Sequence, residues 1–264
     1  MDRDSGPALP ALDGRADLHV HSWWSDGAQS PEALVRVASG RVDVLAVTDH
    51  DEIRGALEAR AFAREHPELG VEVVVGEEVS TLNGHLLALW VEEAIPPRLT
   101  AERTITLIHA QGGLAVAAHP LHPLRYTAWG YLPLAALIRD IPLDAIEVVN
   151  NSGVSCRLYD ARTARRNREW RLPVTGGSDA HDAWYVGSAV TRFAGQDAAA
   201  LRRALVGGAT AAHLAWSWTA GMLPRHFGIK IRSFHRFVRL TRRRVASAAH
   251  RPESVPAGMA HGGA

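Results

Sequence analysis

Short apolar runs alternate with helical patterns along most of the chain. The apolar runs are rich in Val, Leu and Ala, and each has the length of a single strand. We predict strands over residues 16–21, 43–48, 71–75, 85–91, 114–118, 144–149, 173–175 and 188–193. Strands that are apolar at nearly every position are typical of a mostly parallel sheet covered by helices. The pattern therefore predicts an α/β fold.

Helical patterns fill several of the gaps between these runs. Ser30 and Pro31 are a typical helix start, because the serine hydroxyl caps backbone N–H groups and proline fits the first turn. Thr100 opens another helix, which ends at Gly112 and Gly113. Further helices are predicted over residues 54–65, 132–139, 157–169 and 197–206.

Ionisable and polar residues gather at one end of the predicted strands. Six strands contribute Asp17, His19, His21, Asp49, His50, Asp51, Glu77, Glu78, His119, Glu147, Asn150, Asp179 and His181. The carboxyl ends of parallel strands meet at one edge of a barrel or sheet, where active sites of such folds lie. His19 and His21 lie within the first strand, and their spacing of two places both on one face.

These residue types in this pattern favour a metal centre. Two adjacent imidazoles, as in His19 and His21, suit one divalent ion, and the TDHD and GSDAH segments each add carboxylate and imidazole donors. A donor set without thiolates favours Zn, Mn or Fe. Each cluster alone also fits a turn or a helix start. Their joint placement after successive strands favours a centre of two or three ions.

Composition sets limits on this interpretation. The 264 residues are 47% hydrophobic and 22% charged, which fits a globular chain with a sizeable core. The single cysteine, Cys156, excludes an intramolecular disulfide and a four-cysteine zinc site. No apolar run reaches about 18 residues, and the first segment lacks the pattern of a signal peptide. We therefore expect a cytoplasmic protein.

The net charge of +1 conceals an uneven distribution. Residues 1–224 carry a formal charge of −7, and residues 225–264 carry +8. Within the basic part, an apolar stripe at helical spacing consists of Phe227, Ile231, Phe234, Val238 and Val245. We expect an N-terminal extension (1–14), a catalytic domain (15–208), an apolar segment with a basic amphipathic helix (209–250) and a disordered tail (251–264).

Three roles remain open for the basic helix over residues 225–250. It docks on the barrel through its stripe, or it lies on an anionic membrane surface, which would make the protein peripheral at the membrane. The third role, nucleic-acid binding through phosphate contacts, is less favoured. Its aromatic residues lie on the apolar side rather than among the arginines.

The clusters together resemble the PHP (polymerase and histidinol phosphatase) metallohydrolase family. The resemblance rests on DLHVHSWWSDG, LAVTDHDEI, GEEVSTLNGHLLAL, LAVAAHP, DAIEVVN and GGSDAH, in the family's order across residues 15–193. It implies a distorted (β/α)₇ barrel with a trinuclear metal centre. Only 33 residues separate His85 from His119, so the chain resembles compact members without a helical insertion there.

The same resemblance implies a ligand set for three ions. The first ion takes His19, His21, Glu78 and Asp179, the second takes Glu78, His85 and His119, and the third takes Asp26, His50 and His181. Glu78 is the implied bridging carboxylate, although the adjacent Glu77 leaves the choice between them open. Asp17 and Asp49 are implied to orient the imidazoles.

The implied chemistry is hydrolysis by a metal-activated water, with His50, Asp179 and His181 as the catalytic group and Arg125 as the preferred phosphate contact. We expect a metal-dependent phosphoesterase that acts on a small organic phosphate. The alternatives are a carbamate or carboxyl-ester hydrolase, a 5′–3′ oligonucleotide exonuclease or nucleoside-monophosphate phosphatase, and a membrane- or nucleic-acid-tethered module without catalysis.

Overall fold

The computed structural model describes residues 11–122, 128, 130–153, 156–216 and 228. Its strands are β1 (Gly14–Val20), β2 (Val44–Val47), β3 (Glu72–Ser80), β4 (His85–Leu89), β5 (Leu114–Ala117), β6 (Ala145–Asn150), β7 (Val174–Gly177), β8 (Ala189–Phe193) and β9 (Ala211–Leu214). Its helices are α1 (Pro31–Ala38), α2 (Arg54–Glu65), α3 (Ala101–Ala110), α4 (Leu134–Leu137), α5 (Cys156–Trp170) and α6 (Ala198–Val206), with the short η1 (Pro67–Leu69) and η2 (Ala183–Tyr185).

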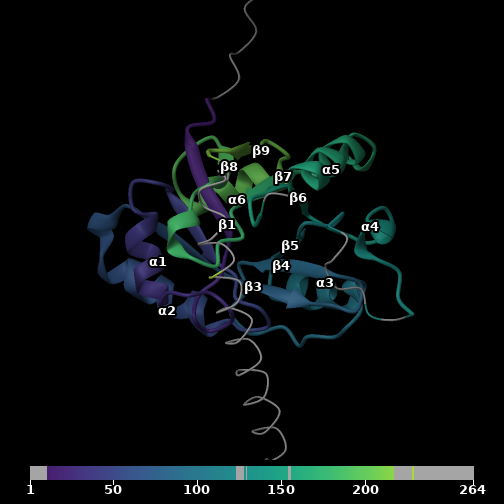
Figure 1. Cartoon of the computed structure of the whole chain (residues 1–264), viewed down its shortest axis with the longest axis horizontal. Coiled ribbons are helices and arrows are strands. Elements are labelled where there is room, and N and C mark those ends of the chain that lie inside the picture. The colour runs from purple at the N-terminus through teal and green to yellow at the C-terminus, as the bar shows by residue number, and fades with distance from the viewer. Residues whose placement is uncertain (1–10, 123–127, 129, 154–155, 217–227, 229–264) are drawn as a thin grey trace, which may run out of the picture.

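All nine described strands form one sheet in the order β7-β6-β5-β4-β3-β2-β1-β8-β9. The sheet curls so that its edge strand β7 returns beside β1 and β8, where a parallel bridge joins Val20 at the end of β1 to Ala180 just after β7. The Thr191 hydroxyl also accepts from the backbone N–H of Gly176 and donates to its carbonyl, both at 3.0 Å. The result is a nearly closed barrel with helices outside it (Figure 1), which confirms the predicted α/β barrel.

The prediction of a mostly parallel sheet is wrong at two strands. β4 runs antiparallel to β3 and β5, and β8 runs antiparallel to β1 and β9. The β3–β4 turn contains Asn83-Gly84, a dipeptide typical of hairpins. This reversal brings the first residue of β4, His85, to the edge where the parallel strands end. The sheet also continues past residue 208, because β9 pairs with β8.

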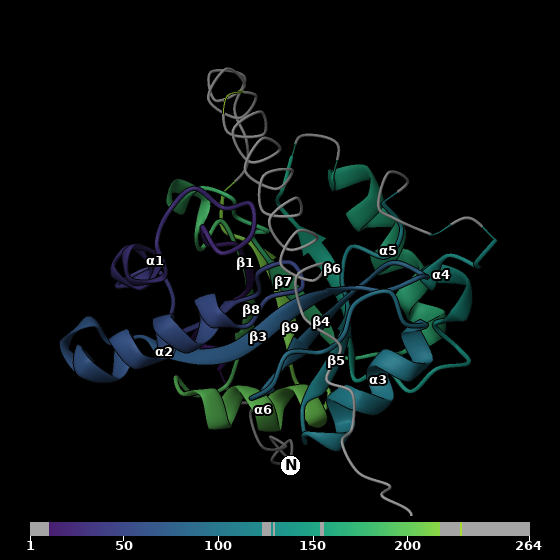
Figure 2. The same cartoon turned by 90° about the horizontal axis from the view of Figure 1, so that it is seen from below.

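Two apolar clusters fill the barrel and its surroundings. The inner cluster includes Leu18, Leu87 and Phe193, and α6 seals its lower end with Leu201 and Leu205 (Figure 2). The outer cluster lies between the sheet and the other helices, of which α1 and α2 flank one side and α4 and α5 the other (Figure 1). Helix α6 covers one end of the barrel, and apolar side chains fill its interior and surround the sheet. Polar groups are therefore left to the other end, where the parallel strands have their carboxyl termini.

Gly177 marks the point where β7 passes close to β1. A Cβ atom there would lie 2.6 Å from the Cβ of His19 and 2.8 Å from Oε1 of Glu147. We expect Gly177→Ala to force the strands apart and to lower the free energy of unfolding by about 1–3 kcal/mol, as overpacking does. Urea unfolding of the full chain measures the change.

Gly207→Ala is the control, because a Cβ there meets only the carbonyl oxygens of Arg203 and Ala204, at 3.1 and 4.0 Å. We expect a smaller loss from this substitution. Equal losses from the two substitutions would show that the close approach of β7 and β1 does not limit stability.

Candidate metal centre

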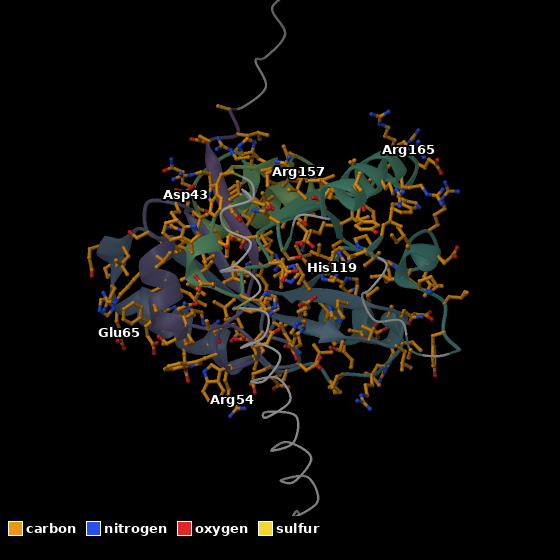
Figure 3. The ribbon with its side chains drawn as sticks, viewed as in Figure 1. Asp43, Arg54, Glu65, His119, Arg157 and Arg165 are labelled. Carbon is orange, nitrogen blue, oxygen red and sulfur yellow. The ribbon has the colours of Figure 1, made fainter. Side chains whose placement is uncertain are left out.

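The nine side chains predicted as ligands come together at the carboxyl end of the barrel. They form four overlapping groups of three or four donors, and within each group the ligand atoms lie within 4.8 Å of one another. The members are His19, His21, Asp26, His50, Glu78, His85, His119, Asp179 and His181. Figure 3 shows one of them, His119, between the two halves of the barrel.

A bulge in β1 aims the first histidines into this space. The pairing of β1 with β2 shifts register between Asp17 and Val20, and such a bulge re-aims side chains. Leu18 therefore stays in the inner apolar cluster while His19 and His21 turn toward the acidic residues. Two separate strand features thus place ligands at the centre: the bulge in β1 places His19 and His21, and the reversed β4 places His85.

The first group of donors surrounds one point. Nε2 of His19 and Nε2 of His21 lie 3.2 and 3.3 Å from Oε2 of Glu78. Oδ1 of Asp179 lies 3.2 Å from Nε2 of His21 and 3.7 Å from Nε2 of His19. These four atoms belong to the four residues that the resemblance assigns to the first ion.

The other oxygen of Glu78 faces a second group. Its Oε1 lies 2.6 Å from Nδ1 of His85 and 2.9 Å from Nε2 of His119. A carboxylate whose two oxygens face two sets of imidazoles has the geometry of a bridge between two ions.

The third group centres on Asp26. Nε2 of His181 lies 2.9 Å from Oδ2 of Asp26, and Nδ1 of His21 lies 3.7 Å from Oδ1. His50 lies between this group and Glu78, with Nε2 at 4.0 Å from Oδ1 of Asp26 and Nδ1 at 3.1 Å from Oε2 of Glu78. Its position is compatible with either neighbouring group.

The position of Glu78 within β3 separates it from Glu77. The strand predicted to end at residue 75 continues to Ser80, so both glutamates lie inside it and point to opposite faces. Glu78 points into the histidine cluster, whereas Oε2 of Glu77 accepts a hydrogen bond of 2.9 Å from the backbone N–H of Ile95. Glu77 therefore anchors a loop outside the cluster.

Glu147 on β6 positions the imidazoles. Its Oε1 lies 3.0 Å from Nδ1 of His19, and its Oε2 accepts from the backbone N–H of His119 at 2.9 Å. Asn150 donates to both Glu147 and Asp179, at 2.9 and 3.2 Å. The sequence left two roles open for Glu147 and Asn150, support of the metal ligands or simply the end of a strand, because their partners come from other strands.

Asp17 and Asp49 were expected to orient the imidazoles. In the structure their carboxylates accept hydrogen bonds from backbone N–H groups and serine hydroxyls instead. Asp17 accepts from the N–H groups of Ser178 and Gly187 at 2.9 and 2.8 Å, on both sides of the loop that carries Asp179 and His181. Burial raises the pKa of each aspartate to about 6.

The corresponding contacts of Asp49 lie in the loop after β1. Its carboxylate accepts from the backbone N–H and the hydroxyl of Ser22, at 2.8 and 2.6 Å, and from the hydroxyl of Ser25. This loop carries His21 and Asp26. Both aspartates therefore position ligands by fixing the loops that bear them.

The clamp on the loop after β7 has a second part. The Arg41 guanidinium donates to the carbonyl oxygens of Ala183, Trp184 and Val186, at 3.4, 3.1 and 3.1 Å. Together with Asp17, it holds the segment that carries His181 from two directions.

The electrostatics of the cluster suit divalent cations. Burial and the nearby His181 and His50 lower the pKa of His21 to about 3. Burial disfavours the charge of Glu78, but attraction to His50, His85 and His19 outweighs it and holds its pKa well below the usual range. Burial disfavours the charge of His19, but the carboxylates of Asp179, Glu147 and Glu78 outweigh it and raise its pKa well above the usual range. The carboxylates thus attract positive charge, which divalent cations would supply while the imidazoles stay neutral.

Unsatisfied atoms lead to the same conclusion. Nε2 of His19, both ring nitrogens of His21 and Oε2 of Glu78 are buried without a hydrogen-bond partner in the described part of the chain. Buried polar atoms without partners are costly. Nitrogen and oxygen donors aimed at common points would recover this cost by binding cations, so the residues present fit such a centre.

Several expected features lie outside the described residues. These are Arg125, the stripe of Phe227, Ile231, Phe234, Val238 and Val245, and the segments 217–227 and 229–264. The described arginines of α5 (Arg157, Arg162, Arg165, Arg166 and Arg168) are exposed, and Figure 3 shows Arg165 away from His119. Among the described helices, none has the length and apolarity to cross a membrane.

Asp160 on α5 is a titratable group just behind the centre. Its Oδ1 accepts a hydrogen bond of 3.2 Å from the backbone N–H of Asn150. Burial, with a further contribution from the charge of Glu147, raises its pKa to about 8. The folded chain therefore retains a proton that the unfolded chain, with a carboxyl pKa near 3.8, releases.

As the pH rises from about 4 to about 8, this difference should lower the stability of the folded protein. Asp160→Asn removes the titration, so its melting temperature relative to the wild type should increase between pH 5 and pH 8. Scanning calorimetry at both values measures the shift, with the exposed Asp140→Asn as control. A difference that does not change with pH, or that shrinks at pH 8, would contradict a raised pKa.

Comparisons with known proteins agree with this geometry. The chain matches the family model described as PHP domain over residues 17–120 and the model described as PHP-associated over residues 161–210. It is 37% identical over 148 residues to an uncharacterized protein of Methanocaldococcus jannaschii, a match that covers 52% of this chain and 81% of that protein.

Two further similarities are informative. Over 87 residues the chain is 42% identical to a phosphoribosyl 1,2-cyclic phosphate 1,2-diphosphodiesterase of Eggerthella lenta, covering 30% of this chain and 32% of that enzyme. Its fold resembles a two-domain protein of Bacteroides vulgatus containing a predicted PHP-like metal-dependent phosphoesterase. The TM-score is 0.61 and the identity 20%, and the match covers 86% of this chain and 74% of that chain.

Proposed function

Because the chain belongs to the PHP family of metal-dependent phosphoesterases, we propose that its metal centre hydrolyses a small organic phosphate. The observation that carries this proposal is the position of Glu78, whose two oxygens face separate groups of imidazoles. Divalent ions bound on both sides of a carboxylate generate a hydroxide from water and hold the oxygens of a phosphate.

The proposed ligands follow from the three groups of donors. His19, His21, Asp179 and Oε2 of Glu78 would hold the first ion, and His85, His119 and Oε1 of Glu78 the second. Asp26, His181 and His50 would hold the third. The donor chemistry favours Mn, Zn or Fe.

Neighbouring residues prepare these ligands for the reaction. Glu147 fixes the ring of His19 through Nδ1, which leaves Nε2 directed at the centre. Nδ1 of His181 donates to the carbonyl oxygen of Asp179 at 2.9 Å. Its Nε2, which faces Asp26, therefore carries no proton in the neutral ring and can offer its lone pair to an ion. These hydrogen bonds select the tautomers that metal binding needs.

The substrate reaches the centre on the side of Asp26 and His50. Their side chains are 16% and 13% exposed, whereas those of His19 and His21 are fully buried. We therefore place His50, with His181 beside Asp26, nearest to the reacting phosphate. Asp179, the third member of the predicted catalytic group, has a fully buried side chain and would act by holding an ion. A proton for the leaving oxygen would come from this side.

The compact site supports a small substrate. Between His85 and His119 the chain contains β4, α3 and β5, and α3 packs into the outer core through Ile105 and Ile108 rather than over the ligands. The Eggerthella lenta relative is named for a small cyclic phosphate. Other relatives are named 5′–3′ exoribonucleases, so the compact site is the observation that favours a small phosphate over an oligonucleotide.

The adjacent glutamates provide a matched test. Glu78→Gln removes the bridging charge, so we expect loss of bound metal and a fall in phosphatase rate of about 100-fold or more. Glu77→Gln keeps an oxygen for the Ile95 N–H and should retain metal and activity. Elemental analysis of the purified proteins gives metal per chain. A panel of phosphomonoesters, cyclic phosphodiesters, an oligonucleotide and aryl esters, with added Mn²⁺, gives the rates.

Each outcome of the panel has a defined meaning. Hydrolysis of small phosphates that depends on Glu78 and not on Glu77 supports the proposal. Hydrolysis of aryl esters alone, or of the oligonucleotide in preference to small phosphates, would replace the proposed substrate. Equal metal content and activity in the two variants would overturn the proposed centre.

A further inference from the structure

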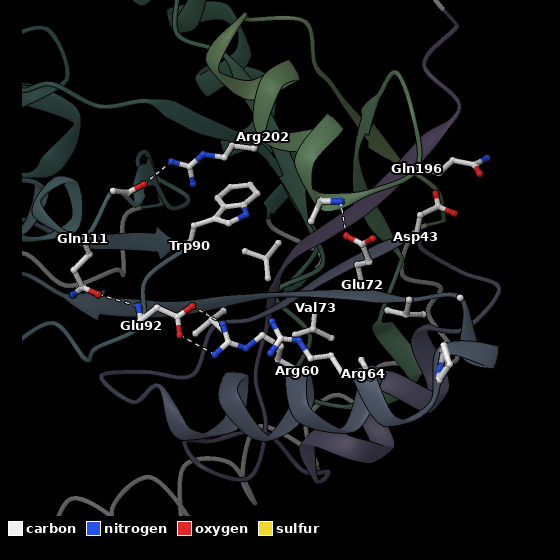
Figure 4. Close-up of a pocket in the computed structure, with 18 residues that line it drawn as sticks. Asp43, Arg60, Arg64, Glu72, Val73, Trp90, Glu92, Gln111, Gln196 and Arg202 are labelled. Carbon is white, nitrogen blue, oxygen red and sulfur yellow. Dashed lines mark hydrogen bonds and ion pairs between the residues drawn. The ribbon is translucent and has the colours of Figure 1, made fainter.

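A second hollow lies at the opposite end of the barrel from the metal centre. Its volume is about 980 Å³, and it is bounded by α2, the start of α6 and the amino-terminal half of β3 (Figure 4). Glu72 and Val73 line it, whereas Glu78 at the metal centre lies near the other end of the same strand. None of the proposed metal ligands borders this hollow, which we call the arginine pocket.

The carboxylates of the arginine pocket already have partners. Glu92 accepts from both terminal nitrogens of Arg60, the second at 2.8 Å. Oε2 of Glu72 accepts from the N–H of Ala198 at 2.8 Å. Asp43 accepts from the N–H of Arg15 at 2.7 Å. Glu92 is thus paired with Arg60, and Asp43 lies 3.8 Å from Nε of Arg15. Glu72 keeps its negative charge, because its partner is a neutral backbone N–H.

Two further guanidiniums line the pocket. Arg64 follows Arg60 by one turn on the same face of α2. It helps to lower the pKa of Glu92, whose two oxygens are bonded to Arg60. Arg202 on α6 donates to the carbonyl oxygen of Gly112 and to no described carboxylate. With Asp43 paired to Arg15 and Glu92 paired to Arg60, the two positive charges of Arg64 and Arg202 exceed the negative charge of Glu72 by one.

An aromatic surface lies beside these charges. Trp90 has a φ of 56°, an uncommon value for a residue with a side chain, which costs backbone energy. The guanidinium carbon of Arg202 lies 5.1 Å from the centre of its ring. Figure 4 shows the indole facing the hollow above Val73. This strained position holds a flat apolar surface next to cationic groups.

We propose that the arginine pocket binds a small organic anion, with a phosphate or phosphonate group near Arg64 and a ring against Trp90. Guanidinium groups match phosphate oxygens in bidentate geometry, and aromatic side chains favour flat partners. The hollow has the size of small-molecule sites, which span about 300–1,000 Å³. This site would be separate from the metal centre and independent of the proposed hydrolysis.

Phenylphosphonate is a suitable probe, because its P–C bond resists hydrolysis and it carries both a dianion and a ring. Calorimetric titration of the full chain, purified with its metals, should give two molecules bound per chain. We expect Arg64→Gln and Arg202→Gln each to weaken one of these about tenfold, which corresponds to about 1.4 kcal/mol. The exposed Arg168→Gln on α5 is the control and should bind both molecules as the wild type does.

The second variant set separates this site from the metal centre. Glu78→Gln should remove the other molecule and leave the one that depends on Arg64. Thermal unfolding confirms that each variant is folded. A wild type in which no bound molecule is weakened by Arg64→Gln and Arg202→Gln would overturn the arginine pocket. One bound molecule that these substitutions weaken and Glu78→Gln leaves unchanged would support it. Loss of metal-centre binding alone would not affect it.

Discussion

The metal centre is built around one fully buried carboxylate, which has five imidazole nitrogens within 3.3 Å. The negative charge of this carboxylate is unfavourable inside the protein unless positive charge lies beside it. Glu78 is in this position, beside His19, His21, His50, His85 and His119. Burying a charge is costly unless it is paired. Protonating several imidazoles would not pair this charge favourably. The ring centres of His21 and His181 are only 4.3 Å apart, so two charged rings would repel each other. Divalent ions bound between them would pair with the carboxylates and leave the imidazoles neutral.

The rest of the barrel holds these groups together despite their cost. The bulge in β1, the reversed β4 and the anchored loops after β1 and β7 each aim ligands at Glu78. His119 and Asp179 adopt positive φ values of 31° and 50°. Such strain persists only where the surroundings fix it, and Glu147 and Asn150 provide hydrogen bonds to these two residues. Beneath the metal centre, the inner apolar cluster and α6 fill the barrel and support the strands that carry the ligands.

The sequence carries much of this account, but not all of it. Apolar runs and helix caps predicted the elements, with α2 placed over its full length, because these signals are local. The pattern of polar residues at strand ends included seven of the nine ligands, whereas Asp26, His85 and the division among three ions came from the resemblance to the PHP family. The direction of β4 could not be predicted, because it depends on pairing with β3 and β5. The separate roles of Glu77 and Glu78 could not be predicted either, because they depend on β3 continuing to Ser80. The role of Glu147 depends on neighbours more than 100 residues away, such as His19.

The central claim is that Glu78 bridges two metal ions. Crystals of the full chain, grown from protein purified with its metals, allow anomalous scattering to be measured at the absorption edge of the metal found by elemental analysis. The account predicts separate peaks on the two sides of the Glu78 carboxylate, one next to His19, His21 and Asp179 and one next to His85 and His119. Crystals of metal-containing protein with no peak beside either oxygen of Glu78, or with one peak only, would contradict it.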